Sequence, residues 1–413
     1  MTAEIAIMNT KGIALAADSA VTLGAGKIYN SANTLFALSK YHPVGIMIYG
    51  SAHIMGIEWE TIIKSYRDSL GKKSFDKLQE YAGDFINYLG KFPYFTQEQM
   101  LEYLGDMCLD VFSHILKRFL MELHTEFDGK ENIEPSQIDA VFNTSLKNIK
   151  DMIKETDDEK LIKVDSEFID SNSKMILEKL EYEFENYKLS KKQIAEIISI
   201  LKLNFQKCGW IDNYTGIVIA GYGERQIFPS LHDFKVSGKF GDSLIHFEHD
   251  IDEIGTDHSA SVDPFSQTEM VHQFIRGIDP DFRNVIIDKA DTILNSLLPL
   301  MKDFDKEKIT ELSKLLAEYR DAFSDAVYKD PILDIVGGMQ TNELVSMAEA
   351  MVNLTALKRH VSTDEESVGG PIDVALITKG DGFIWIKNKT NYDPRLNMNL
   401  NQNYFRGSKN ENL

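Results

Sequence analysis

The sequence predicts an α+β fold in which a small β scaffold is interrupted by long helical tracts. Alternating apolar segments bounded by turn residues occur near the start, in the middle and near the end of the chain. Between them, apolar residues recur at helical spacing over two long stretches. With 413 residues and 43% hydrophobic content, the chain can bury one large core or two smaller ones.

The first strands are expected to form a β-hairpin. Residues 2–8 alternate like a strand, residues 9–12 have the composition of a turn, and residues 12–19 return as a strand of small and apolar residues. Because the return is antiparallel and of matching length, it brings Asp18 beside the first residues. The later strands are expected at residues 35–38, 44–52, 217–223, 228–232, 371–377 and 383–386.

Helical tracts fill the intervals between these strands. Thr96 and Gln99 form a capping-box pattern that begins an apolar helix, and Ser190 begins another. Residues 128–170 are polar and acidic, so we expect an exposed connection or a weak helix there. The other periodic segments predict helices at residues 59–70, 75–89, 282–297, 309–323 and 341–360.

Composition excludes several classes of protein. The formal net charge of −20 argues against nucleic acid and anionic membrane surfaces as partners. Cys108 and Cys208 are too few and too far apart for a disulfide framework, and Cys108 lies in an apolar helical stripe typical of a core. Because no secretory signal or apolar run of spanning length is evident, we expect a cytoplasmic protein.

Thr2 offers two reactive groups on one residue if Met1 is removed, which the small threonine side chain permits. Its hydroxyl is a nucleophile, and its free α-amine, with a pKa near ~7.7–8.0, is a base at neutral pH. This pair is the threonine version of an activated nucleophile. The same hairpin is also typical of the first strands of any α/β protein, so these residues alone leave a purely structural role open.

Several segments, taken in order, resemble proteasome β subunits and their bacterial HslV relatives. Residues 12–24 resemble the opening of these proteins, and residues 35–38 and 44–52 follow without gaps as their third and fourth strands. Residues 217–232 are similar to the central hairpin, and residues 367–377 to the Ser-Gly-Gly turn and final strand. The resemblance implies an N-terminal-nucleophile hydrolase, a four-layer αββα sandwich of two stacked antiparallel sheets with helices outside, here with large helical insertions.

The resemblance also implies roles for individual residues. Thr2 attacks an amide carbonyl, and Asp18 orders the surroundings of the nucleophile. Backbone N–H groups near Tyr49 and Gly50 form the oxyanion hole, where donors face the developing negative charge. Tyr49 replaces a glycine of the family, so we expect its side chain to crowd the approach of substrate.

A lysine of the family pattern is missing. Thr34 stands at its position. Lys40 shares the strand parity of Thr34 but lies ~20 Å farther along, beyond side-chain reach. Lys27, in the preceding loop, is therefore the candidate replacement.

The last turn can be aligned in two ways. Glu365 and Val368 stand where the family has an aspartate and a serine, whereas a shift by one residue puts Asp364 and Ser367 there. Glu365 and Ser367 are the candidates for these two positions. Ser261 or Ser266 is a further candidate for a supporting serine of the family.

We expect no metal site and no cofactor. Residues 246–258 gather histidines and aspartates, but the segment looks extended, where an i, i+3 pair of histidines lies on opposite faces. A solvated acidic loop is the favoured interpretation. A calcium loop beginning at Asp250 fails because Ile254 and Ser261 occupy ligand positions. Gly221 to Gly223 lacks the third glycine and the context of a dinucleotide site.

The predicted function is a proteasome-like threonine peptidase acting on a peptide or protein substrate in a homo-oligomer. Two alternatives stay open: an amidase of a small substrate with a helical insertion as lid, and a non-catalytic scaffold or binding protein, which Thr34 and Val368 favour. The residues do not identify an unfoldase partner. The predicted domains are a core of residues 1–55, 210–265 and 340–388, helical insertions at 56–209 and 266–339, and a disordered tail at 389–413.

Overall fold

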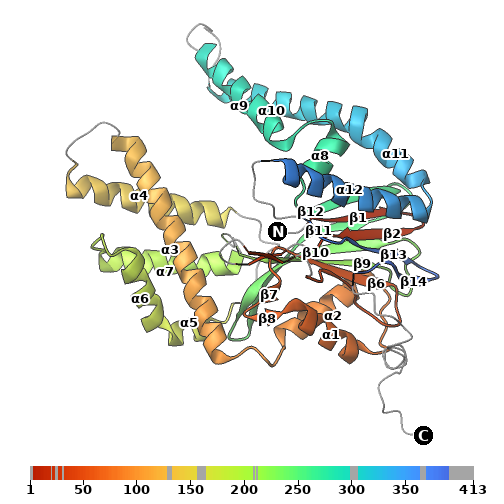
Figure 1. The fold of residues 1–413 in the computed structure, drawn as a ribbon. Coiled ribbons are helices and arrows are strands. Elements are labelled where there is room, and N and C mark those ends of the chain that lie inside the picture. The colour runs from red at the N-terminus through yellow and green to blue at the C-terminus, as the bar shows by residue number, and fades with distance from the viewer. Residues whose placement is uncertain are drawn as a thin grey trace.

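Two antiparallel five-stranded sheets form the centre of the molecule, and helices surround them (Figure 1). This mixture of antiparallel sheets and helices confirms the predicted α+β class. The computed structural model describes residues 3–19, 21–23, 27–29, 32–127, 133–155, 164–207, 210, 213–297, 306–362 and 369–389.

The first sheet has the strand order β12-β1-β2-β13-β14, and all its neighbouring strands are antiparallel. The predicted first hairpin is confirmed, with Glu4 opposite Ala17 and Asn9 opposite Gly12. The expected final hairpin is confirmed as β13 and β14. The strands are β1 (Ala3–Asn9), β2 (Gly12–Ala17), β12 (Ala260–Ser266), β13 (Asp373–Thr378) and β14 (Gly382–Lys387).

The second sheet has the order β11-β10-β9-β6-β5 and contains the predicted central hairpin, β9 with β10. Its strands are β5 (Leu35–Ala37), β6 (Val44–Tyr49), β9 (Thr215–Gly221), β10 (Ser230–Phe240) and β11 (Ser243–Glu253). Two short ribbons pair β3 (Val21–Leu23) with β4 (Lys27–Tyr29) and β7 (His53–Ile54) with β8 (Ile57–Glu58).

The two sheets pack face to face because their side chains alternate. On β1, Ala6 and Met8 belong to an apolar cluster shared with Met47 of the second sheet, whereas Ile5 and Ile7 belong to a cluster shared with helices. All five side chains are buried. Each sheet therefore has one face toward the other sheet and one face toward helices.

Helices cover the outer faces of both sheets. On the second sheet, Trp59, Tyr66 and Phe85 anchor α1 and α2 in one apolar cluster with residues of β6 and β9. On the first sheet, α8, α11 and α12 share a cluster with β1, β2 and β13. These helices are α1 (Trp59–Leu70), α2 (Leu78–Gly90), α8 (Glu269–Arg276), α11 (Asp330–Gly338) and α12 (Thr341–Val361).

Five helices beside the sheets form a core of their own. The capping box predicted at its first helix is confirmed, since the Thr96 N–H donates to Gln99 Oε1 at 2.9 Å and the Gln99 N–H donates to Thr96 Oγ1 at 3.2 Å. These helices are α3 (Gln97–Phe127), α4 (Pro135–Lys154), α5 (Ser166–Ser171), α6 (Ser173–Glu183) and α7 (Lys191–Lys207).

The expectation of an exposed connection or weak helix at residues 128–170 is wrong for α4. Phe142, Leu146 and Ile149 are buried in the core of this helical group. Their spacing is helical, but the charged residues around them conceal the period when the segment is judged by composition. The polar composition of this segment reflects the exposed face of α4, and it gave no indication of the buried apolar face.

A pair of helices, α9 (Pro280–Leu297) and α10 (Lys306–Ser324), extends away from the sheets, and we call this pair the arm (Figure 1). A π-helical segment, η4 (Asp325–Lys329), joins α10 to α11. Across the described ranges, no helix is long and apolar enough to cross a membrane.

Candidate active site

Asp18 links the beginning of β1 to the segment before β13. Its Oδ1 accepts a hydrogen bond from the Ala3 N–H at 2.9 Å, and its Oδ2 accepts one from the Gly369 N–H at 2.7 Å. The Asp18 N–H in turn donates to the Ala3 carbonyl at 3.1 Å. Because the side chain is fully buried and both oxygens accept backbone N–H groups, these are strong, charge-assisted hydrogen bonds.

Thr2, the predicted nucleophile, lies outside the described residues, as does Met1. The Ala3 N–H belongs to the peptide bond that joins Ala3 to Thr2, so Asp18 contacts the chain within one peptide unit of that residue. The antiparallel return therefore brings the carboxylate to the beginning of β1. The catalytic roles of Thr2 and Asp18 stay predictions.

The candidates of the last turn, Glu365 and Ser367, also lie outside the described residues. The chain that follows them is held against β2: the Ser19 N–H donates to the Gly369 carbonyl at 3.3 Å, and the Ser19 hydroxyl donates to the Pro371 carbonyl. This segment is therefore anchored next to Asp18. The roles of Glu365 and Ser367 stay predictions.

Thr34, at the position of the missing lysine, is buried beside Asp18. Its hydroxyl donates to the Asp18 carbonyl at 3.2 Å, and its own carbonyl accepts the Ile48 N–H at 2.9 Å. Thr34 thus ties the second sheet to Asp18 through the backbone without supplying a positive charge. Lys27 lies on the short strand β4 and not, as expected, in a loop. Its side chain is outside the described part, and its proposed role stays a prediction.

The Tyr49 side chain is buried between the sheets. Its hydroxyl donates to both carboxylate oxygens of Asp233, at 2.9 and 3.1 Å. A Cβ at Gly216 would come within 2.0 Å of the Tyr49 ring, so the sheet accommodates the ring only because residue 216 is glycine. Gly50 follows with φ +87°, and a Cβ there would lie 2.8 Å from the Tyr214 carbonyl oxygen. The oxyanion role of Tyr49 and Gly50 stays a prediction.

A polar cavity of about 550 Å³ lies beside the beginning of β1. Ser266, one of its lining residues, pairs with Ala3 in the first sheet and has an unusual φ of +65°. Tyr49 lines the same cavity from the second sheet. Its other polar lining residues are Tyr214, Asp233, Lys235, His249, Asp250, Asp263, Thr268, His272, Arg276 and Lys329.

Charged groups in this cavity are strongly desolvated. Lys235 Nζ lies 3.0 Å from the Asp233 carboxylate and 4.3 Å from the centre of the Tyr49 ring. Burial raises the pKa of Asp233 and lowers that of Lys235, because each charge is removed from water. Burial and the nearby Asp252 carboxylate raise the pKa of Asp263 to about 7. Groups perturbed in this way are common in functional sites, and they also occur in structural networks.

The sequence did not single out Asp233 and Lys235, although a signal was present. Two charged residues at i and i+2 within a strand lie on the same face, here the face between the sheets, which also carries Leu231. Such a pair is costly to bury unless it is partnered.

A buried ion pair near Asp18 was also missed. Lys389 Nζ lies 2.7 Å from the Asp373 carboxylate and donates to the Ala32 carbonyl at 2.6 Å. Asp373 pairs with Ala17, the residue before Asp18. Nothing in the asparagine-rich sequence around Lys389 marks it as a buried residue. Residues 390–413 of the predicted tail lie outside the described residues.

Residues 246–253 of the histidine-rich segment are extended, but they belong to β11, so the expected solvated loop is wrong for them. His258 contacts the Asp252 carboxylate at 3.0 Å. Within the part of the chain that the structure describes, no group of three or more His, Cys, Asp or Glu side chains could hold a metal ion. Cys108 is buried in α3, and burial raises the pKa of its thiol to about 12, which disfavours the nucleophilic thiolate.

No protein-family model and no curated protein matches the sequence. Similar solved structures include Anbu from Hyphomicrobium sp. strain MC1, at 9% identity and a TM-score of 0.30 over 100% of this chain and 99% of that one. A Gly-1 mutant of Anbu from the same strain has 10% identity and a TM-score of 0.28 over 100% and 99% of the two chains. Anbu (ancestral beta-subunit) from Yersinia bercovieri has 9% identity and a TM-score of 0.28 over 97% and 94%.

These findings correct the family resemblance drawn from the sequence. The assignment to proteasome β subunits and HslV is wrong: no family model supports it, and the similar structures are Anbu proteins at 9–10% identity. The matching segments are short strands of small and apolar residues ending in glycine turns, a pattern that many β-hairpins share. At these TM-scores the likeness to Anbu carries no argument about this chain.

Proposed function

We propose that this chain hydrolyses amide bonds with Thr2 as the nucleophile once Met1 has been removed. The observation that carries the proposal is the buried Asp18 carboxylate, which accepts the N–H of the peptide between Thr2 and Ala3. A carboxylate at this place holds Ala3, the residue that follows the proposed nucleophile, at the beginning of β1. We further propose that the two sheets with their covering helices are a four-layer αββα sandwich.

The proposed chemistry needs no further cofactor. The free α-amine takes the proton of the Thr2 hydroxyl as the oxygen attacks the amide carbonyl, and it returns the proton to the leaving amine. Water then hydrolyses the ester on Thr2 and regenerates the hydroxyl. In this scheme N–H groups near Tyr49 and Gly50 stabilise the oxyanion, and Lys27, Glu365 and Ser367 are the candidate supporting groups.

The substrate class is proposed to be a peptide, and the polar cavity supports a short one. About 550 Å³ is within the range of small-molecule sites and accommodates a few residues of an extended chain. A small-substrate amidase is therefore the second candidate. We also propose that the protein works as a homo-oligomer, which the exposed apolar residues of the arm support.

The test begins with the intact mass of the purified protein, which reports whether Met1 is removed. The protein is then treated with an electrophile selective for N-terminal threonine, and the adduct is mapped. Thr2→Ala is expected to abolish labelling and hydrolysis, whereas Thr10→Ala, a matched change in the turn of the same hairpin, leaves both intact. Asp18→Asn is expected to reduce the rate by roughly 10²–10³ if the folded content by circular dichroism is unchanged.

Casein and short acyl-peptides distinguish the two substrate classes. Cleavage of acyl-peptides alone favours the amidase, and cleavage of both favours the peptidase. Retention of Met1, or equal inertness of the wild type and Thr2→Ala toward every substrate, contradicts hydrolysis and leaves the scaffold or binding role.

A further inference from the structure

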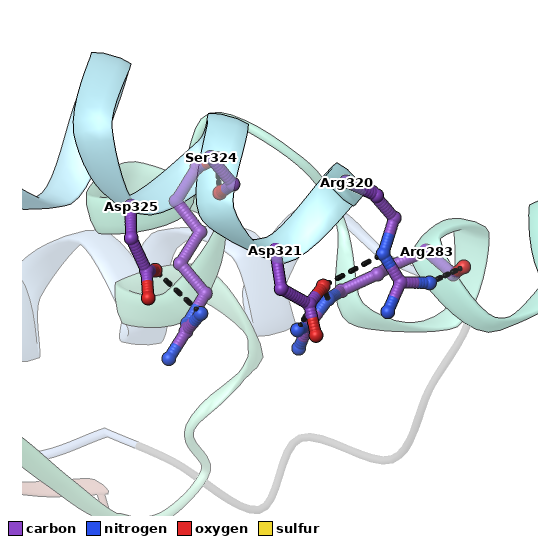
Figure 2. Close-up of polar contacts among 6 residues, drawn as sticks. Arg283, Arg320, Asp321, Ser324 and Asp325 are labelled. Carbon is purple, nitrogen blue, oxygen red and sulfur yellow. Dashed lines mark hydrogen bonds and ion pairs between the residues drawn. The ribbon is translucent and has the colours of Figure 1, made fainter. Parts of the chain in front are cut away.

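Polar side chains join the two helices of the arm where α9 begins and α10 ends. Arg283 and Arg320 both donate to the Asp321 carboxylate, at 3.1 and 2.8 Å, and Arg320 also donates to the Arg283 carbonyl at 2.7 Å (Figure 2). The buried residues of α10 that the structure describes are Ile309, Ser313 and Ser324. Because the first turn of α9 contacts the last turn of α10, the helices run antiparallel.

Large apolar side chains of the arm point to solvent instead. Tyr319 is 71% exposed, and Phe282 and Ile293 are 58% and 59% exposed. A helical hairpin that is stable by itself buries most of its large apolar residues, whereas these side chains are exposed. The exposed apolar face of the arm consists of Phe282, Val285, Ile286, Ile293, Leu312, Leu315, Leu316, Tyr319 and Phe323.

The spacing of these residues is that of a helix-bundle seam. Residues 312, 316, 319 and 323 follow the 4-3-4 spacing of heptad a and d positions, and residues 282, 286 and 293 fit the same spacing. On each helix these residues form a stripe along one side. At about 100° per residue, the stripe lies roughly a quarter-turn around the helix from the residues that face the other helix, and the direction of this rotation is the same in α9 and α10. In antiparallel helices this puts both stripes on one side, so the arm presents a single continuous apolar face.

We propose that the arm of a second copy of this chain covers this face, so that two arms form an intermolecular four-helix bundle. A self-complementary interface of this kind needs the same apolar face on both partners, which identical arms supply. The inference rests on the self-association proposed above and is independent of whether Thr2 hydrolyses amides.

Charge and area favour a second copy. The chain carries a net charge of −20, yet α9 and α10 together hold six basic and seven acidic residues, so two copies meet there with little repulsion. The seven half-exposed side chains of the two stripes contribute roughly 700 Å² per copy at about 100 Å² each. A stable interface buries about 600–1,000 Å² per partner, so the face is large enough.

The experiment compares the self-association of charge variants by analytical ultracentrifugation. Phe282→Glu with Tyr319→Glu places acidic groups on both stripes at exposed positions, where the fold of one copy tolerates them. We expect this double variant to weaken self-association by roughly 30-fold or more. Tyr182→Glu, an equally exposed change on α6 and far from the arm in sequence, is the matched control and retains wild-type association.

A mixing experiment identifies the occupant. Phe282→Lys with Tyr319→Lys should also be monomeric, and mixing it with the Glu variant should restore a heterodimer because opposite charges then face each other. A monomeric wild type overturns both self-association and this interface, leaving another protein or the chain's own tail as the occupant. An oligomer that survives the Glu variant overturns the interface alone.

Discussion

The α1–α2 pair and the arm have the same kind of sequence pattern, but the apolar residues of one pair are buried and those of the other are exposed. In α1 and α2, apolar residues at helical spacing are buried against the second sheet, with Trp59 and Phe85 at 0% exposure. In the arm, Phe282 and Phe323 occupy equivalent periodic positions and are 58% and 53% exposed. Periodicity therefore predicts a helix and its apolar face, whereas the neighbour that covers this face is set by the tertiary structure.

The largest expected effect is on the buried side of this comparison. Phe85→Ala removes a fully buried ring whose centre lies 5.0 Å from that of Tyr66, and we expect the free energy of unfolding to fall by about 3–5 kcal/mol. Phe282→Ala is expected to change it by less than ~0.5 kcal/mol when the protein is dilute enough to keep copies apart. Urea unfolding of both variants, followed by tryptophan fluorescence and circular dichroism, measures the difference.

Equal losses in the two variants would break the comparison, because Phe282 would then belong to the core of a single copy. A loss of unfolding free energy for Phe282→Ala that appears only at high protein concentration would strengthen the contrast between the two helix pairs. Such a dependence arises when association stabilises the folded state by mass action.

Charged groups give the same contrast between buried and exposed sites. Lys389→Met leaves the buried Asp373 carboxylate without its cation beside Asp18, and we expect a loss of about 3–5 kcal/mol. Lys314→Met in the arm removes an exposed partner of Glu318 at 3.9 Å, and we expect a change within ~0.5 kcal/mol. Thermal or urea unfolding compares the two. A near-neutral Lys389→Met would mean that water reaches the Asp373 carboxylate.

Local features of the fold were predictable from the sequence. The β1–β2 hairpin, the central hairpin and the capping box at Thr96 depend on residues close together in the chain, and each is found where expected. The contact of Asp18 with the beginning of β1 follows from the same local geometry. Short-range pairing fixes these features before any tertiary packing is considered.

Features that depend on distant segments were not predictable. Lys389 meets Asp373 and the Ala32 carbonyl only because β13 joins β2. The cavity forms where both sheets approach α8 and η4. The family assignment failed for a related reason, since short strand patterns constrain hairpins and not the identity of the whole chain. The Asp233–Lys235 spacing was a further site signal in the sequence that was not used.

The smallest expected effect concerns the polar contacts that hold the arm together (Figure 2). Hydrogen bonds from Arg320 and Arg283 lower the pKa of Asp321 to about 2, below its usual value of 3.8. A lowered carboxyl pKa contributes stability that is present above the usual value and lost as the pH falls through about 2. Because the Asp321 side chain is 38% exposed, solvent screening limits this contribution.

Asp321→Asn is therefore expected to reduce the free energy of unfolding by less than ~1 kcal/mol at pH 7, with the difference from wild type shrinking as the pH falls from 4 toward 2. Asp288→Asn, an exposed change on the other helix of the arm, is the control. Urea unfolding at several pH values measures both variants. A pH-independent difference would mean that Asp321 acts through its shape and not its charge. The arm would then be held together by the packing of its inward side chains, and the contrast with α1–α2 would lie only in which residues face solvent.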